Sequence, residues 1–368
     1  MNMWRLIRPD AEQTLHDETC RRSLPRYFGA FQDRRRAKFL ISKRLEADFQ
    51  EDESTEDLWG KHSSLNEPYL ELERGIDDGL VKFDSLPTPR ASYLDLKIEI
   101  ARRIMGRCHL CERRCGKNRL KGEVGVCEAG SEMRVNSMFT HTGEEACLVP
   151  SFTIFTIHCN LFCAHCQNWS LSRGMDVGDF YAPEDLAVHI DGARAQGNRN
   201  ANLVGGDPTP WLWHWLRVFK HVKANIPIVW NSNSYFSEEV ARLLMGFSDV
   251  WLTDIKYGND ECAERISNAP RYWDVATRNH LMAKGQVEFL IRVLVLPGHL
   301  ECCTKPILNW ISENLGPATR VNVMFQYRPE YNASKFPELK RRLSAEERER
   351  AKEIAKESNL LSLEPWQE

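Results

Sequence analysis

The stretch C-N-L-F-C-A-H-C, residues 159–166, places three cysteines on one short loop, directly after the apolar, β-prone run 152–157. Cysteine thiolates are the usual ligands of iron–sulfur clusters, and three of them can hold three irons of a cubane cluster. The fourth iron then has no protein ligand in the loop and is open to a substrate or cofactor. The spacing therefore predicts a 4Fe–4S cluster on Cys159, Cys163 and Cys166. Unrelated buried cysteines, or zinc with a distant fourth ligand, are the alternatives.

Strand-like and helix-like segments alternate after this loop. Repeated strand–helix units imply parallel strands with helices outside them, in either a barrel or a doubly wound sheet. Further helices are predicted over 93–105 and from Ser344, where Ser344 and Glu347 fit a capping box. The predicted strands are 152–157, 200–205, 227–231, 250–256, 287–295 and 321–326, and the helices between them are 183–196, 210–223, 237–245, 272–284 and 306–314.

Polar residues on one face of three predicted strands favour the barrel. Side chains two residues apart in a strand point the same way, and a sheet covered by helices on both faces should be apolar on both. We therefore expect an interior lined for a ligand, with mutual salt bridges in a ligand-free barrel as the alternative. The residues that share a face are Asp254 and Lys256, Glu288 and Arg292, and Asn322 and Gln326.

The turn G-G-D-P-T-P, residues 205–210, ends the second predicted strand. Its two glycines let a ligand approach the backbone closely, and Pro210 can occupy the first turn of the next helix. Alone, this segment would be read as a tight turn. After a C-x3-C-x2-C loop, at the end of the next strand, it is much more specific.

Together these motifs resemble the radical S-adenosylmethionine (SAM) enzymes. From about residue 108 to 329 the chain looks like their pyruvate formate-lyase activating enzyme-like branch, through C-H-L-C-E-R-R-C-G, H-C-N-L-F-C-A-H-C-Q-N, G-G-D-P-T-P, D-I-K-Y, I-R-V-L-V-L-P-G and M-F-Q-Y-R-P. The resemblance implies a partial (β/α)6 barrel and a 4Fe–4S cluster whose open iron is chelated by SAM. One electron then cleaves SAM, and a 5′-deoxyadenosyl radical abstracts hydrogen. A one-electron donor such as flavodoxin or ferredoxin is implied.

A SAM pocket follows from the resemblance and from the residue types. The Gly-Gly-Asp turn offers backbone and a carboxylate to the ammonium group, and Arg292 is the expected partner of the SAM carboxylate. The sequence departs from the family at His158, His165 and Asp207, where glycine, an aromatic residue and glutamate are usual. No catalytic residue is assigned. The predicted SAM-binding residues are Gly205, Gly206, Asp207, Ser232, Asn233, Asp254, Lys256, Arg292 and Gln326.

A second cysteine group lies upstream, as C-x2-C-x3-C-x11-C among several glycines. Four soft ligands at this spacing predict a metal, either a structural zinc or an auxiliary iron–sulfur cluster. The four ligands are Cys108, Cys111, Cys115 and Cys127.

Two classes of function remain open from the sequence. The first is a radical SAM oxidoreductase of unknown substrate, either an activase that takes hydrogen from a glycine of a partner protein or an enzyme that modifies another molecule. The second is a non-catalytic iron–sulfur or zinc protein with a redox or scaffold role. Reductive release of 5′-deoxyadenosine and methionine from SAM would separate them.

Composition predicts a soluble, cytoplasmic protein. A net charge of −3 suggests neither a nucleic-acid nor a membrane partner. Residues 1–10 lack the apolar region of a signal peptide, and no run approaches the roughly 18 apolar residues of a membrane span. Twelve cysteines there favour metal ligation over disulfides. Free thiols are predicted for the cysteines without ligand spacing, namely Cys20, Cys147, Cys262, Cys302 and Cys303.

The chain divides into four predicted regions. Residues 1–100 form a charged helical N-terminal extension whose opposite charge blocks, 34–44 and 46–57, should form a solvated face. Residues 101–147 form the Cys-rich metal-binding segment, 148–328 the radical SAM core, and 329–368 a C-terminal helical tail.

Overall fold

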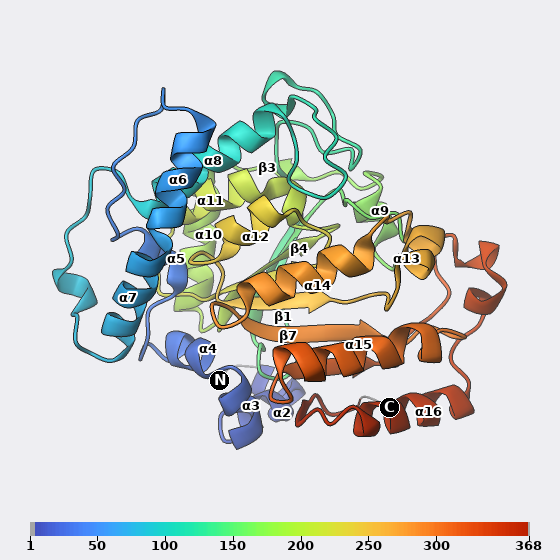
Figure 1. Ribbon diagram of the computed structural model, residues 1–368. Coiled ribbons are helices and arrows are strands. Elements are labelled where there is room, and N and C mark those ends of the chain that lie inside the picture. Colours follow the sequence, from blue (N-terminus) through green and yellow to red (C-terminus); the bar gives the residue numbers. More distant parts are fainter. Residues whose placement is uncertain (1–3, 367–368) are drawn as a thin grey trace.

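One sheet forms the centre of the computed structural model, which describes residues 4–366 (Figure 1). Its strand order is β3-β1-β2-β4-β5-β6-β7-β8-β9. Neighbours from β2 to β9 are parallel, whereas β1 pairs antiparallel with both β2 and β3. The strands are β1 (Arg134–His141), β2 (Ser151–Thr156), β3 (Asp179–Phe180), β4 (Asn200–Gly205), β5 (Ile228–Ser232), β6 (Val250–Asp254), β7 (Glu288–Leu294), β8 (Arg320–Met324) and β9 (Ser362–Leu363).

The helices that follow the parallel strands lie outside the sheet (Figure 1). The sheet ends at β3 and β9 instead of closing, so the predicted α/β fold with a partial barrel is confirmed. The outer helices are α9 (Trp169–Ser172), α10 (Pro183–Ala195), α11 (Leu212–His221), α12 (Glu238–Leu244), α13 (Asp260–Ser267), α14 (Tyr272–Ala283), α15 (Lys305–Trp310) and α16 (Ala345–Glu357).

The six predicted strands are present with ends shifted by no more than two residues, because alternation and β-branched content are strong there. The helix predicted over 306–314 is part of a longer run, in which α15 is flanked by the π-helical segments η4 (Leu300–Thr304) and η5 (Ile311–Leu315). The capping box of Ser344 and Glu347 is confirmed at the start of α16. Strands β1, β3 and β9 and helix α13 were missed, since none follows the strand–helix alternation.

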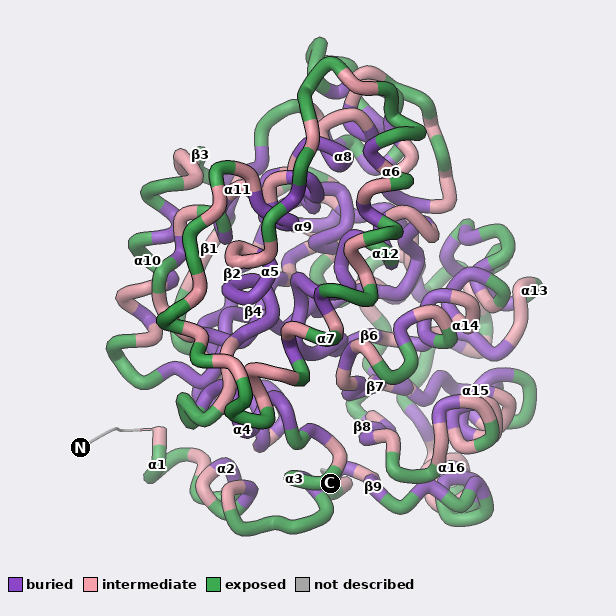
Figure 2. Tube along the Cα trace, turned by 60° about the vertical axis from the view of Figure 1, so that its left-hand side comes forward, coloured by how far each residue is buried: buried purple, intermediate pink, exposed green. Residues whose placement is uncertain are grey.

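The N-terminal extension is helical, as predicted. Its helices are α1 (Trp4–Ile7), α2 (Pro9–Gln13), α3 (Glu18–Ser23), α4 (Pro25–Phe31), α5 (Lys38–Ser42), α6 (Thr55–Ser64), α7 (Asn66–Asp77) and α8 (Tyr93–Gly106). Figure 2 shows much of α4, α5 and α8 as buried, while α1 is largely exposed. Therefore most of this extension belongs to the folded body of the molecule.

The prediction of a wholly solvated charged face is wrong at Lys38. This residue is buried, and its Nζ lies 2.6 Å from Oε1 of Glu73. Buried Arg26 joins the same network through Asp249, with Nη1 3.0 Å from Oδ1. Burying a charge is unfavourable unless it is paired, so opposite charges far apart in the sequence meet here.

Helix α4 closes the base of the barrel. Its aromatic residues pack with Leu24 and with the first residues of β5, β6 and β7 in a separate buried cluster. Glu288, at the start of β7, accepts the backbone N–H groups of Arg26 and Tyr27 at 2.6 and 2.8 Å. Glu288 was expected to face a ligand, but it caps this helix because it lies at the opposite end of the strand from the cysteine loop.

No helix among residues 4–366 is long and apolar enough to cross a membrane.

Candidate active site

The cysteine loop follows β2, and backbone hydrogen bonds hold it against α13. Phe162 donates its backbone N–H to the carbonyl of Ser267 at 3.1 Å, and Ala164 donates to Ile266 at 2.9 Å. Both acceptors lie at the end of α13. Cys159 is 7% exposed, and Cys163 and Cys166 are partly exposed. The loop therefore presents three cysteines at the carboxyl ends of the parallel strands, where active sites of such folds lie.

The Gly-Gly turn after β4 packs on the start of this loop. Gly206 and Asp207 donate their N–H groups to Thr156 and His158 at 2.9 and 3.0 Å. A Cβ on Gly206 would lie 2.0 Å from the carbonyl oxygen of His158, and one on Gly205 would lie 1.9 Å from that of Thr156. Close ligand approach was the predicted reason for these glycines. The structure gives another reason, because backbone atoms at the end of β2 and just before the cysteine loop, at Thr156 and His158, occupy the space of both side chains.

One cavity of about 730 Å³ contains this region. The residues predicted to hold the cluster and SAM come from six strands, β2 and β4–β8, and meet in it, although their roles stay predictions. Tyr327, the residue after Gln326, does not line this cavity, and it donates its hydroxyl to the carbonyl of Leu339 at 2.7 Å. The predicted residues that line the cavity are Cys159, Cys163, Cys166, Gly205, Gly206, Asp207, Ser232, Asn233, Asp254, Lys256, Arg292 and Gln326.

Asp207 connects the loops after β4 and β5. Its carboxylate accepts the N–H of Thr209 at 2.9 Å, the N–H of Asn233 at 2.8 Å and the hydroxyl of Ser232 at 3.0 Å. Burial raises the pKa of this carboxyl group, and the hydrogen bonds oppose that effect. Asn233 in turn donates to Oδ1 of Asn160 at 2.7 Å, and its Nδ2 lies 3.5 Å from Cys159 Sγ. The turn, the β5 end and the cysteine loop thus share one hydrogen-bond network.

Arg292 lies inside the barrel between two glutamates that the sequence reasoning missed. Its Nε and Nη2 each lie 2.7 Å from an oxygen of Glu145, and Nη2 also binds Glu144. Asn322 donates to Glu145 at 2.7 Å, and Asn202 donates to Glu144 at 3.0 Å. Burial raises the pKa of Glu144, but Arg292 and His141 together outweigh burial and lower that pKa to about 2. The one local signal was the pair of adjacent acids a few residues before the apolar residues Leu148 and Val149.

A second ion pair lies beside the cysteine loop. Lys256 Nζ is 2.6 Å from Oδ2 of Asp254. Burial opposes the charge on Lys256, yet Asp254 and the Cys163 sulfur raise the lysine pKa. His165 is buried edge-on to Tyr257 and Tyr327, at centroid distances of 6.4 and 6.0 Å, and burial lowers its pKa to about 3. Burial therefore favours the neutral form of His165.

The upstream cysteines also meet at one place. All four line a small cavity of about 10 Å³ beside Arg119 and Pro210. The chain folds tightly here, since Cys108 donates its N–H to Lys117 and Gly116 donates to Cys108, each at 2.9 Å. A small space enclosed by four cysteines suits a metal ion, although its occupant stays a prediction.

With this geometry established, comparisons place the chain in a family. Residues 153–311 match the model of the Radical SAM superfamily. The chain is 43% identical over 343 residues to the uncharacterized protein MJ0674 of Methanocaldococcus jannaschii, covering 92% of this chain and 98% of that protein. The chain carries a radical SAM superfamily domain over residues 153–311. Such a domain implies an enzyme that uses SAM and a 4Fe–4S cluster, and the C-x3-C-x2-C loop lies within the matched region.

Two solved structures are also similar. The crystal structure of Streptococcus suis SuiB bound to the precursor peptide SuiA aligns with a TM-score of 0.42 and 14% identity, over 57% of this radical SAM chain and 46% of SuiB. SuiB bound to S-adenosylmethionine aligns with a TM-score of 0.40 and 12% identity, over 57% and 48% of the two chains.

Proposed function

We propose that this protein is a radical SAM oxidoreductase that cleaves SAM reductively, with a 4Fe–4S cluster on Cys159, Cys163 and Cys166. The observation that carries the proposal is that these three cysteines and every predicted SAM-binding residue line one cavity. When bound, the cluster supplies the electron that cleaves SAM, so that a 5′-deoxyadenosyl radical can take a hydrogen atom from a substrate. The radical SAM domain supports this chemistry.

The chemistry of the cysteines fits an iron cluster. Burial raises the pKa of the Cys159 and Cys163 thiols, so their thiolates need a cationic partner, which iron supplies. The N–H of Leu161 and the Nδ2 of Asn233 lie 3.4 and 3.5 Å from Cys159 Sγ. Such donors stabilise negative charge on a ligating sulfur, and hydrogen bonds of this kind tune cluster potentials.

The charge of the cavity favours SAM, whose sulfonium and ammonium groups are cationic. Among the described residues that line it, seven are acidic and four are lysine or arginine. Arg292 stays the proposed partner of the SAM carboxylate. Nε and Nη2 are bound to Glu144 and Glu145, whereas Nη1 makes only a long contact of 3.4 Å to Asn231 and is the nitrogen with donor capacity left for a ligand.

The finer assignment is an activase-like role. The motif resemblance to the pyruvate formate-lyase activating enzyme-like branch supports a protein glycine as the hydrogen donor and flavodoxin or ferredoxin as the electron donor. For the upstream site, we propose a structural zinc on Cys108, Cys111, Cys115 and Cys127, because all four border one small cavity.

Anaerobic turnover tests the proposed reaction. Reconstituted and reduced protein should release 5′-deoxyadenosine and methionine from SAM, and Cys163→Ala should abolish that release. Cys20→Ala is the matched control, since Cys20 lies in the separate cluster at the base of the barrel, and it should retain turnover. Equal turnover in Cys163→Ala and wild type would refute the ligand assignment. Deuterium transfer from a labelled glycine of a candidate partner protein into 5′-deoxyadenosine tests the activase role separately.

A further inference from the structure

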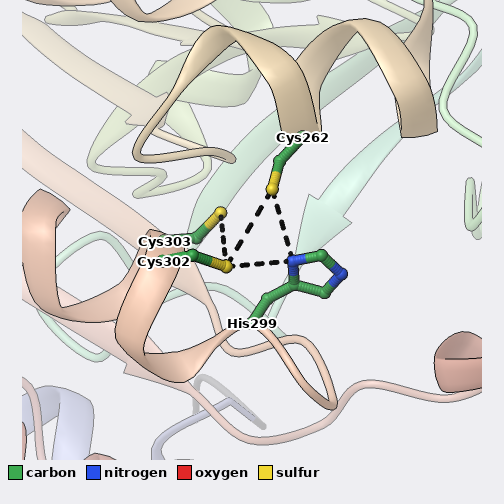
Figure 3. Close-up of side chains that lie close together, drawn as sticks. All are labelled: Cys262, His299, Cys302 and Cys303. Atoms are coloured by element: carbon green, nitrogen blue, oxygen red, sulfur yellow. Dashed lines mark hydrogen bonds between the residues drawn. The ribbon is translucent and has the colours of Figure 1, made fainter.

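A group of three cysteines and one histidine meets outside the cavity (Figure 3). Cys262 lies in the first turn of α13, whereas His299, Cys302 and Cys303 lie at the start of the helical run after β7. Their ligand atoms all lie within 4.8 Å of one another. These cysteines were predicted to be unrelated free thiols, because the spacing of Cys262 from the others resembles no ligand motif. The fold brings them together.

The separations match the edges of a metal tetrahedron. Cys302 Sγ lies 3.9 Å from the sulfurs of both Cys262 and Cys303. His299 Nδ1 lies 3.5 Å from Cys262 Sγ and 3.3 Å from Cys302 Sγ. A tetrahedral Zn²⁺ with ordinary bond lengths spaces two sulfurs by about 3.8 Å and a sulfur and a nitrogen by about 3.6 Å. A disulfide would require about 2.0 Å, and a cubane cluster would place each thiolate on a separate iron, further apart.

We propose that Cys262, His299, Cys302 and Cys303 bind one Zn²⁺ ion. This group is called the Cys3His site below. Its residue types form one of the common ligand sets of structural zinc. The site is independent of the proposed SAM chemistry, since none of its four residues lines the SAM cavity.

The surroundings of His299 support its role as a ligand through Nδ1. Its Nε2 lies 3.5 Å from Oε1 of Glu338, and Arg265 holds the same carboxylate oxygen at 2.7 Å. If Nδ1 binds a metal, Nε2 carries the proton and faces this carboxylate, the usual arrangement of zinc-bound histidines. Three thiolates around Zn²⁺ also leave one negative charge, which the Arg265 guanidinium, 3.3 Å from Nε2, can offset.

The Cys3His site is both enclosed and reachable. His299, Cys303 and Cys262 are buried, while Cys302 is exposed and gives an ion access. Asn259 donates to the Cys302 carbonyl at 2.8 Å, with its Nδ2 3.8 Å from Cys303 Sγ. A Cβ on Gly258 would lie 2.7 Å from the Cys303 carbonyl oxygen. These contacts hold the segment after β6 against the segment after β7.

Zinc there would fix the helix that supports the cysteine loop. Cys262 is in the first turn of α13, and the last residues of α13 accept the N–H groups of Phe162 and Ala164. The Cys3His site therefore has a structural role, joining two strand ends behind the proposed cluster.

Zinc content tests this proposal. Full-length protein purified with Zn²⁺ should hold one more zinc per chain than the Cys262→Ser/Cys303→Ser variant. The control Cys20→Ala/Cys147→Ala removes two buried cysteines at the base of the barrel and should keep the wild-type zinc content. Equal zinc in wild type and the Cys262→Ser/Cys303→Ser variant would overturn the proposal. Iron instead of zinc, lost with the same two cysteines, would also overturn it.

A milder variant tests the same site if the Cys262→Ser/Cys303→Ser variant does not fold. Glu338→Gln keeps all four ligands and should weaken zinc binding at one site by about 10- to 100-fold, as measured by competition with a chelator. Substitution with Co²⁺ should give thiolate-to-cobalt charge-transfer bands, part of which is lost in Cys302→Ser. Unchanged zinc affinity in Glu338→Gln together with an unchanged cobalt spectrum in Cys302→Ser would exclude the site.

Discussion

Gly206 lies so close to the cysteine loop that a methyl group has no room there. A Cβ would lie 2.0 Å from the His158 carbonyl oxygen, and backbone cannot move aside as a flexible side chain can. We expect Gly206→Ala to lower the free energy of unfolding by about 1–3 kcal/mol or more and to reduce the iron retained after reconstitution. Urea unfolding and iron analysis measure both effects.

Gly192 provides the matched control for this substitution. It lies inside α10, and a Cβ there would meet no atom within 4 Å. Gly192→Ala should therefore raise the free energy of unfolding by roughly 0.5–1 kcal/mol, the usual gain of alanine over glycine in a helix. If Gly206→Ala were as stable as Gly192→Ala, the proposed packing of the turn against the loop would be wrong.

Asp207 is a buried carboxylate that accepts three hydrogen bonds at the cavity. Because the carboxylate accepts from two backbone N–H groups and a hydroxyl, Asp207→Asn would direct an NH₂ group at one of these donors. An unsatisfied buried donor costs about 1–3 kcal/mol, and we expect that loss in urea unfolding, together with weaker SAM binding by calorimetry. Asp176→Asn, at a half-buried position outside this network, should change neither quantity. Wild-type stability of Asp207→Asn would contradict the network described here.

The sequence placed the predicted site residues at the ends of strands, and the structure gathers them in one cavity, since motif spacing and strand alternation are local signals. It could not identify Glu144 and Glu145, because their partner Arg292 lies almost 150 residues away and only the fold brings them together. The Cys3His site was missed for the same physical reason. Long-range pairs leave no periodic pattern in the chain.

At the scale of elements, α4 depends on a carboxylate from the sheet. Its N-cap residue Leu24 offers no side-chain hydrogen bond, and Glu288 accepts the N–H groups of Arg26 and Tyr27 instead. Glu288→Gln retains one acceptor oxygen and loses the carboxylate charge at the helix N-terminus, which burial already reduces near neutral pH by raising the pKa of Glu288 to about 7. We expect faster hydrogen exchange over residues 25–31, with Ala201 in the sheet as the unchanged reference. Unaltered exchange in α4 would show that apolar packing alone holds it.

Helix α13 connects the proposed zinc with the cysteine loop. Removing zinc from the Cys3His site should loosen the first turn of α13 and, through it, the acceptors of Phe162 and Ala164. We expect these two amides to exchange faster in Cys262→Ser/Cys303→Ser than in wild type, while those of β4 stay protected. Equal exchange at Phe162 and Ala164 would mean that α13 is fixed by packing and that zinc does not act on the loop.

For the whole molecule, the repeated strand–helix core could be predicted from the sequence, whereas the packing of the N-terminal helices against that core could not. Strands β2 and β4–β8 each belong to a strand–helix unit, and the repetition of this unit supported the prediction of a parallel sheet. The N-terminal helices lack that regularity. Their charged residues were predicted to lie on the surface, but Lys38 and Glu73 form an ion pair in the interior. Burial of charge depends on the tertiary partner, which composition does not reveal.

Buried neutral histidines should make the whole molecule sensitive to acid. His280 Nδ1 donates to the Ala276 carbonyl and its Nε2 accepts from Thr253, each at 2.7 Å, so the folded state holds the neutral form. Burial lowers the pKa of His280 to about 4 and that of His214 to about 3. In the unfolded chain histidine titrates near 6.5. Their contribution to stability is thus complete above about pH 6.5 and is lost as the pH falls toward 4.

From these values we expect each of the two histidines to remove about 2 kcal/mol of unfolding free energy between pH 7.5 and pH 5. His280→Gln cannot take up a proton, so its loss over the same interval should be smaller than that of wild type by about that amount, even if the variant is less stable at pH 7.5. Urea unfolding of both proteins at pH 5, 6, 7.5 and 8.5 measures the difference, and the highest two pH values serve as an internal control because neither histidine titrates there. If wild type and His280→Gln lost stability in parallel below pH 6.5, His280 would have to be protonated in the folded protein, and the two hydrogen bonds assigned to its neutral ring would be wrong.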